Sequence, residues 1–276
     1  MSTVDQRNWA HGLVNAFRSR SANVVWFNVQ RAQVANDLDA RIDAPEKISQ
    51  NDTLWCGYAS ILYTAARDQP QNYAWFIIGL FENGRGYLNF VRDGPAVPIE
   101  ADESIRRGSL PRFLDNGGKL TAEMPQADYV ALAALRDHFK TTSGDIAEEI
   151  PLLNLLNAVH GSSGGELCKA LEKLGCKHTY DQSSYFSTRD MGFLNAAGGH
   201  FDQGHTVLLY IDSSLLDLSK AQAGHANHWV GLTSSVTYSP DRRNVKFDVF
   251  SWGKKYTVDT TVQVVQLRFF GFVTGY

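Results

Sequence analysis

The order of apolar and polar positions predicts helices in the first two thirds of the chain. Apolar residues recur at helical spacing, and Pro70 and Asn83-Gly84 bound one of these segments in the way that helix starts and stops do. Glycine pairs such as Gly198-Gly199 are interpreted as loop hinges between such segments. The expected helices are Trp55–Arg67, Gln71–Glu82, Gln126–Phe139, Ile150–Val159 and Gly165–Leu174.

After His205 the pattern changes to the alternation that is typical of half-buried strands. The expected strands are Thr206–Ile211, His228–Val236, Val245–Trp252, Lys255–Val258 and Val264–Val273. Helices first and strands last favour an α+β domain, in which an antiparallel sheet packs against an early helix.

Composition narrows the class of protein. The 276 residues are 43% apolar and 20% charged, with a formal net charge of −3, so no basic footprint for nucleic acid exists. The longest apolar run, Tyr73–Phe81, is far shorter than the roughly 20 residues of a membrane span. The first residues lack a signal-peptide pattern, and three cysteines form no disulfide framework. We therefore expect a soluble protein made in a reducing cytoplasm, without nucleic-acid or membrane partners.

Cys56 is the candidate nucleophile. It stands at the start of an expected helix, where unpaired N–H groups and the macrodipole favour a thiolate. Gly57 follows and would let the backbone approach a substrate closely. Gln50 lies six residues upstream, where its amide could donate to an oxyanion together with the Cys56 N–H.

His228 is the candidate general base, because it opens an expected strand that would hold the imidazole in place. The turn chemistry of Ser239-Pro240-Asp241-Arg242 predicts a hairpin whose centre lies between Pro240 and Asp241. His228 then pairs near Gly253. In this register Ser251 is about 7 Å from His228 along the strand, whereas Asp248 is roughly 17 Å away and on the opposite face.

These segments together resemble the papain-like cysteine peptidases. The matching order is Gln50-(five residues)-Cys56-Gly57-Tyr58-Ala59-Ser60, then His228-Trp229-Val230-Gly231, then Ser251-Trp252-Gly253. The first segment looks particularly like double-glycine bacteriocin-processing peptidases and like papain-like toxins delivered by bacterial secretion systems, such as type VI secretion.

The resemblance implies a papain-like α+β fold over residues 1–276, with the nucleophile helix packed on an antiparallel sheet and a helical insertion at about 110–200. It also implies an oxyanion glutamine at Gln50, a nucleophile at Cys56 and a base at His228. The family's third residue, Asn or Asp, would fall at Phe250, which cannot orient an imidazole. Ser251 is therefore our candidate for that role, in a site that depends mainly on the Cys–His pair.

The function implied is a cysteine endopeptidase that cleaves a protein substrate through an acyl-enzyme, with no cofactor and no metal. The resemblance to delivered toxins further implies a bacterial effector, made without a signal peptide and acting in the cytoplasm of a target cell. It would have a protein substrate there and a cognate immunity protein as a partner.

Several alternatives stay open. His225 could replace His228 as the base, while Cys168 and Cys176 are most simply buried structural thiols. His200 and His205, with nearby acidic residues, do not match a known metal-ligand spacing. The same fold could also carry deamidase or transglutaminase chemistry, or serve as a catalytically inactive binding module. The Asp-Cys-Ser signature of papain-like peptidoglycan amidases is absent.

Overall fold

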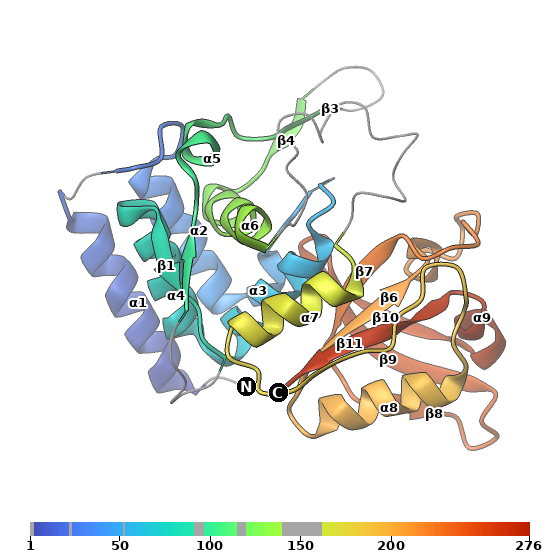
Figure 1. Ribbon diagram of the computed structural model, residues 1–276. Helices are drawn as coiled ribbons and strands as arrows, with labels where there is room; N and C mark the ends of the chain where they lie inside the picture. The colour runs from blue at the N-terminus through green and yellow to red at the C-terminus, as the bar shows by residue number, and fades with distance from the viewer. Residues whose placement is uncertain (1–2, 22–23, 52, 91–96, 115–119, 140–161) are drawn as a thin grey trace.

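The computed structural model describes residues 3–21, 24–51, 53–90, 97–114, 120–139 and 162–276. Over these residues the chain is an α+β structure, with a group of helices beside an antiparallel sheet (Figure 1). No helix in the described ranges is long and apolar enough to cross a membrane.

Helices dominate up to Asp202 and strands dominate beyond it. The helices are α1 Val4–Ser19, α2 Arg31–Asp43, α3 Cys56–Asp68, α4 Pro70–Asn83, α5 Glu103–Arg107, α6 Gln126–Phe139, α7 Gly164–Lys173, α8 Met191–Asp202 and α9 Val262–Gln266, with 3-10 turns η1 Pro45–Lys47 and η2 Ser213–Leu215. The strands are β1 Arg85–Tyr87, β2 Pro98–Glu100, β3 Arg112–Leu114, β4 Leu120–Glu123, β5 Thr179–Asp181, β6 Thr206–Ile211, β7 His228–Leu232, β8 Thr237–Tyr238, β9 Asn244–Ser251, β10 Lys254–Thr261 and β11 Phe269–Gly275.

The main sheet runs in the order β10-β9-β7-β6-β11-β5, with β8 beside β9, and its pairs are antiparallel. Strand β7 is central, with Gly231 opposite Leu208 of β6 and Phe250 of β9. A Cβ added at Gly231 would lie 3.6 Å from Cβ of Ser60, so α3 approaches the sheet closely at this glycine. The rings of Tyr63 and Phe250 stack beside it at 4.3 Å between centroids.

The two faces of this sheet pack against different helices. Leu208, Trp229 and Phe250 belong to the core that the sheet shares with the helical group. Because successive side chains of a strand point to opposite faces, their neighbours in sequence belong to a second core. That core includes Leu194 of α8 and Val265 of α9. The sheet is therefore covered on both sides, and α3 lies on the face that Trp229 and Phe250 form.

The predicted α+β class is confirmed, and β6 has the bounds that were expected. The strand prediction for Val264–Val273 is wrong in its first part, because Thr261 caps a helix there by accepting from the Val264 N–H at 3.3 Å. Gly198-Gly199 is not a hinge either but lies inside α8. A Cβ at Gly198 would meet Val236 at 3.0 Å, so a small residue serves close packing there. The helix expected over Ile150–Val159 lies outside the described residues.

The segment expected as a helical insertion, about 110–200, is joined to the rest of the structure at several points. It contains α6, α7 and α8, and also β5, which forms the edge of the main sheet beside β11. Helix α7 packs across the start of α3, where a Cβ on Gly57 would lie 2.6 Å from Leu167 Cδ2. Gly57 was expected to leave room for a substrate, and here its space is taken by Leu167.

We therefore expect Gly57→Ala to lower the free energy of unfolding by about 1–3 kcal/mol, since the new methyl group overpacks against Leu167. Urea unfolding measures the change. Gly12→Ala is the matched control, because Gly12 lies in α1 with nothing within 4 Å of the added Cβ. That control should gain roughly 0.5–1 kcal/mol from helix propensity. Equal gains in both variants would contradict the close packing of α7 on α3.

Candidate active site

Cys56 is the first residue of α3, as its sequence context predicted. The preceding turn is closed by Thr53, whose N–H and hydroxyl both donate to the Gln50 carbonyl, at 3.2 and 2.7 Å. Trp55 is the N-cap residue, and its side chain makes no capping hydrogen bond. The first N–H groups of α3 therefore remain available to the thiol. From the sheet, the Trp229 N–H donates to Cys56 Sγ at 3.4 Å.

The charge state of Cys56 differs from the sequence expectation. Burial raises the pKa of the thiol to about 11, against the opposing hydrogen bonds from the backbone of Trp229, Gly57 and Cys56 itself. Desolvation therefore outweighs the helix N-terminus. Cys56 is therefore a neutral thiol in this structure.

His228 is the first residue of β7, also as predicted, and its side chain is buried. Burial lowers the pKa of the imidazole to about 3, because no charged partner offsets the desolvation of the cation. Its ring stacks on Trp252 at 4.1 Å between centroids and 11° between planes. Among the described contacts, Cys56 Sγ and the imidazole share no hydrogen bond; the two residues meet through the peptide N–H that follows His228.

Ser251 is the residue that the structure places against the imidazole, with its Oγ 2.5 Å from His228 Nε2. Gly231 pairs with Phe250 and Leu232 with Val249, which is the register between these two segments that the sequence predicted. Ser251 is then a diagonal neighbour of His228 on the same face, within reach of an aromatic ring.

The hairpin tip is one residue from the predicted position, because Tyr238 pairs with Val245. Between Thr233 and Thr237 the chain has two residues more than the facing segment between Lys246 and Asp248. In this segment Ser234 Oγ accepts the Asp248 N–H at 2.7 Å. This irregularity restores the predicted register at the His228 end. The carboxylate of Asp248 accepts from Thr257 Oγ1 at 2.7 Å, on the face opposite Ser251.

A tight turn holds Ser251 and the stacked tryptophan in place. Ser251 pairs with Lys254, so Trp252 and Gly253 are the two residues of a hairpin turn. Both have positive φ, 43° and 75°, which is typical of a type I′ turn. A bulky residue is uncommon in this region, and at Trp252 the conformation coincides with the ring stacked on His228.

Gln50 lies in the turn that leads to Cys56, but its side chain faces that turn. The amide is buried, and Nε2 donates to the Thr53 carbonyl at 3.3 Å. The structure therefore brings Gln50 into the same loop as the nucleophile without a described contact between its amide and Cys56.

The other candidate residues lie apart from this arrangement. His225 is half-buried, with Nδ1 3.1 Å from the Ala223 carbonyl oxygen and its ring against Tyr185, and no described contact links it to Cys56. Cys168 is half-buried and Cys176 is buried. His200 and His205 face each other with 3.0 Å between their Nδ1 atoms. Within the described residues, no group of three or more His, Cys, Asp or Glu side chains is arranged to hold a metal ion.

Two residues outside the sequence hypothesis also support the site. Asp212, considered there only among the acidic neighbours of His200 and His205, accepts the N–H groups of Ala223 and Gly224, at 2.6 and 3.2 Å, in the loop before His228. Asp128 was not singled out, and it accepts the Ser49 N–H at 2.9 Å in the turn before Cys56. The signal for Asp128 was present, since it is an acidic residue within the apolar stretch of its helix.

Comparisons with protein-family models, with curated proteins and with solved structures find no match for this chain. The geometry of the site therefore carries the functional argument. Two surface cavities, of about 450 and 560 Å³, do not include Cys56, His228 or Ser251 in their linings.

The low pKa of His228 predicts acid lability. The folded-state pKa, about 3, lies below the ordinary histidine value of 6.5, so the contribution of this group to the free energy of unfolding is full above about pH 6.5 and is lost as the pH falls toward 3. The loss should approach roughly 1.4 kcal/mol for each pH unit in that window. Urea unfolding across this range should show a shallower acid loss for His228→Gln than for wild type. His225→Gln, at a half-buried histidine, is the control, and an unchanged slope in His228→Gln would contradict the neutral buried imidazole.

For a site in which His228 is the general base, the hydrogen bond to Nε2 predicts that Ser251→Ala lowers kcat/KM by about tenfold, since a hydroxyl orients an imidazole less strongly than a carboxylate would. Asp248→Asn is the matched control on the same strand, with its side chain on the other face, and should leave kcat/KM unchanged. A loss confined to the asparagine variant would contradict this assignment.

Proposed function

We propose that this protein is a cysteine endopeptidase that acts through an acyl-enzyme, with Cys56 as nucleophile and His228 as general base. The observation that carries the proposal is that residues from three distant segments of the chain meet at the first residues of α3 and β7. Cys56 Sγ lies 3.4 Å from the backbone N of the residue after His228, and Ser251 engages His228 Nε2. In this proposal the other ring nitrogen, Nδ1, receives the thiol proton.

The arrangement of protons follows from this geometry. For Nδ1 to accept a proton, Nε2 must carry the ring hydrogen and donate it to Ser251 Oγ. The stacked Trp252 keeps the ring plane fixed and shields this hydrogen bond from water. Ser251 and Trp252 thus act as orienting residues for His228.

In the acylation step, Cys56 Sγ attacks the carbonyl carbon of the scissile peptide bond while its proton passes to His228 Nδ1. The displaced electron pair becomes the oxyanion, which the Cys56 N–H and a reoriented Gln50 amide stabilise. Collapse of this intermediate breaks the C–N bond, and the amine leaves with the proton from His228. Water then attacks the thioester with His228 again as base, which releases the acid and restores the thiol.

The neutral resting state supports general-base catalysis over a preformed ion pair. Burial holds the thiol pKa near 11 and the imidazole pKa near 3, so the resting site holds no thiolate–imidazolium pair. Substrate binding must also open the site, because Cys56 and His228 are both buried. The resemblance to delivered papain-like toxins extends the proposal to a bacterial effector that cleaves a target-cell protein and is neutralised by a cognate immunity protein.

The same burial favours a second candidate, a papain-like module that binds a protein partner without catalysis. The alternative chemistry of the same acyl-enzyme, deamidation or transglutamination, would start from a glutamine side chain. Product analysis separates all three, because only proteolysis creates new N-termini.

The test is to incubate the protein with a bacterial lysate and to identify new N-termini by amine labelling and mass spectrometry. We expect discrete new N-termini with wild type and none with Cys56→Ala or His228→Ala, because the pair acts as a unit. Cys168→Ala is the matched control and should cleave as wild type does. Glutamine modified without chain cleavage would establish the rival chemistry, and identical products from wild type and Cys56→Ala would support the binding module.

A further inference from the structure

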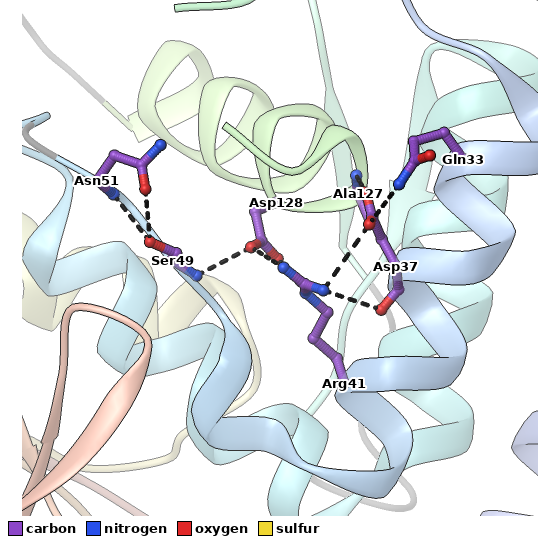
Figure 2. A network of polar contacts seen from close by, with 7 residues as sticks. All are labelled: Gln33, Asp37, Arg41, Ser49, Asn51, Ala127 and Asp128. Carbon is purple, nitrogen blue, oxygen red and sulfur yellow. Dashed lines mark hydrogen bonds and ion pairs between the residues drawn. The ribbon is translucent and has the colours of Figure 1, made fainter. Parts of the chain in front are cut away.

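A buried ion pair links the helical group to the turn before Cys56. Asp128 of α6 is fully buried and receives two parallel hydrogen bonds from Arg41 of α2, Nε to Oδ1 at 3.0 Å and Nη2 to Oδ2 at 2.7 Å (Figure 2). This bidentate geometry fixes the direction of the carboxylate and suits an ionised pair. Burial raises the pKa of the Asp128 carboxyl, and Arg41 opposes that effect.

The same carboxylate also contacts the turn that leads to Cys56. Asp128 Oδ2 accepts the N–H of Ser49 at 2.9 Å, and Ser49 immediately precedes Gln50. Ser49 Oγ in turn donates to Asn51 Oδ1 at 2.8 Å and accepts the Asn51 N–H at 3.2 Å. Figure 2 shows this chain of contacts running from Arg41 to Asn51. Asn51 has φ of 50°, so the polar network holds a left-handed turn in place.

Ser49 also contacts the turn that orients His228. A Cβ added at Gly253 would lie 3.5 Å from Ser49 Cβ and 3.9 Å from the Ile48 carbonyl oxygen. Gly253 is the second residue of the hairpin turn that follows Ser251. One backbone segment, Ile48–Asn51, thus lies between Asp128 on one side and both halves of the site on the other.

We propose that Asp128 is a positioning residue for this site, which holds Gln50 and the Ser251–Gly253 turn in register with Cys56 through the Ser49 N–H. The proposal rests on the proposed acyl-enzyme function. A buried ion pair adds little net stability over apolar residues of similar volume, so the directional hydrogen bond to Ser49 is what this pair adds. Loss of this hydrogen bond should therefore slow reactions of Cys56 that form an oxyanion, and it should not slow reactions that need the thiol alone.

Two reactions of Cys56 separate these effects. Acylation by an amino-acid p-nitrophenyl ester forms an oxyanion, whereas alkylation by iodoacetamide displaces iodide and forms none. Arg41→Met/Asp128→Leu removes the ion pair and the acceptor for Ser49 together, with apolar replacements that retain the packing. Arg41→Met/Asp128→Asn removes the charges and keeps an acceptor.

We expect the leucine variant to acylate roughly tenfold to a hundredfold more slowly than wild type, as displaced catalytic groups do. Its rate of alkylation should be unchanged, and the asparagine variant should recover most of the lost acylation. Adding Gln50→Ala to the leucine variant should cause little further loss, since both changes act on the same segment. Arg31→Met/Glu82→Leu is the control, because it removes another ion pair between helices, at 2.6 Å, that does not contact Ser49.

Equal acylation by wild type and the leucine variant would overturn the proposal, and so would parallel losses of acylation and alkylation. If the leucine variant does not unfold cooperatively, Ser49→Pro removes the same hydrogen bond from the donor side. Ile48 already has ψ of 123°, which suits a residue before proline. A wild-type protein that is alkylated but never acylated would instead overturn the proposed function, and the positioning role with it.

Discussion

The close approach of α3 to strand β7 is the contact on which both the core and the site depend. Gly231 presents no side chain toward Ser60, and the Tyr63 ring stacks on Phe250 of the next strand. This packing sets the height of α3 above the sheet. It thereby brings the first residue of the helix to the Trp229 N–H, so that a single apolar interface fixes where the Cys56 thiol meets the sheet.

The same packing explains the charge state of the site. Excluding water from the end of α3 raises the pKa of Cys56 and lowers that of His228 together, since burial penalises the charged form of each. A helix N-terminus and three backbone donors do not reverse this effect. The resting site therefore stores no ion pair, and in the proposed reaction proton transfer follows the entry of substrate.

Much of the site could be predicted from the sequence, because it depends on local signals and on the alternation of side chains along a strand. A strand places alternate residues on one face, so the hairpin register alone put Ser251 on the side of His228 and Asp248 on the other. The tip itself was misplaced by one residue, and a local irregularity with two extra residues compensated for it. Helix α1 also has local signals, a capping box between Thr3 and Gln6 and apolar residues at helical spacing, Ala10, Val14 and Phe17, and the sequence prediction missed it.

What the sequence could not supply depends on contacts between distant segments. Asp128 and Arg41 are 87 positions apart, and neither spacing nor composition indicates that they meet beside Ser49. The packing at Gly57 could not be predicted either, because the side chain beside it, Leu167, belongs to the distant helix α7. Apolar contacts of that kind fix how close two elements lie but leave rotation and sliding less constrained, since they are non-directional. Hydrogen bonds with fixed donors and acceptors restrict the remaining freedom. In this chain they occur at the three places where the site is assembled: Trp229 on Cys56, Ser251 on His228, and Asp128 on the turn that joins the two.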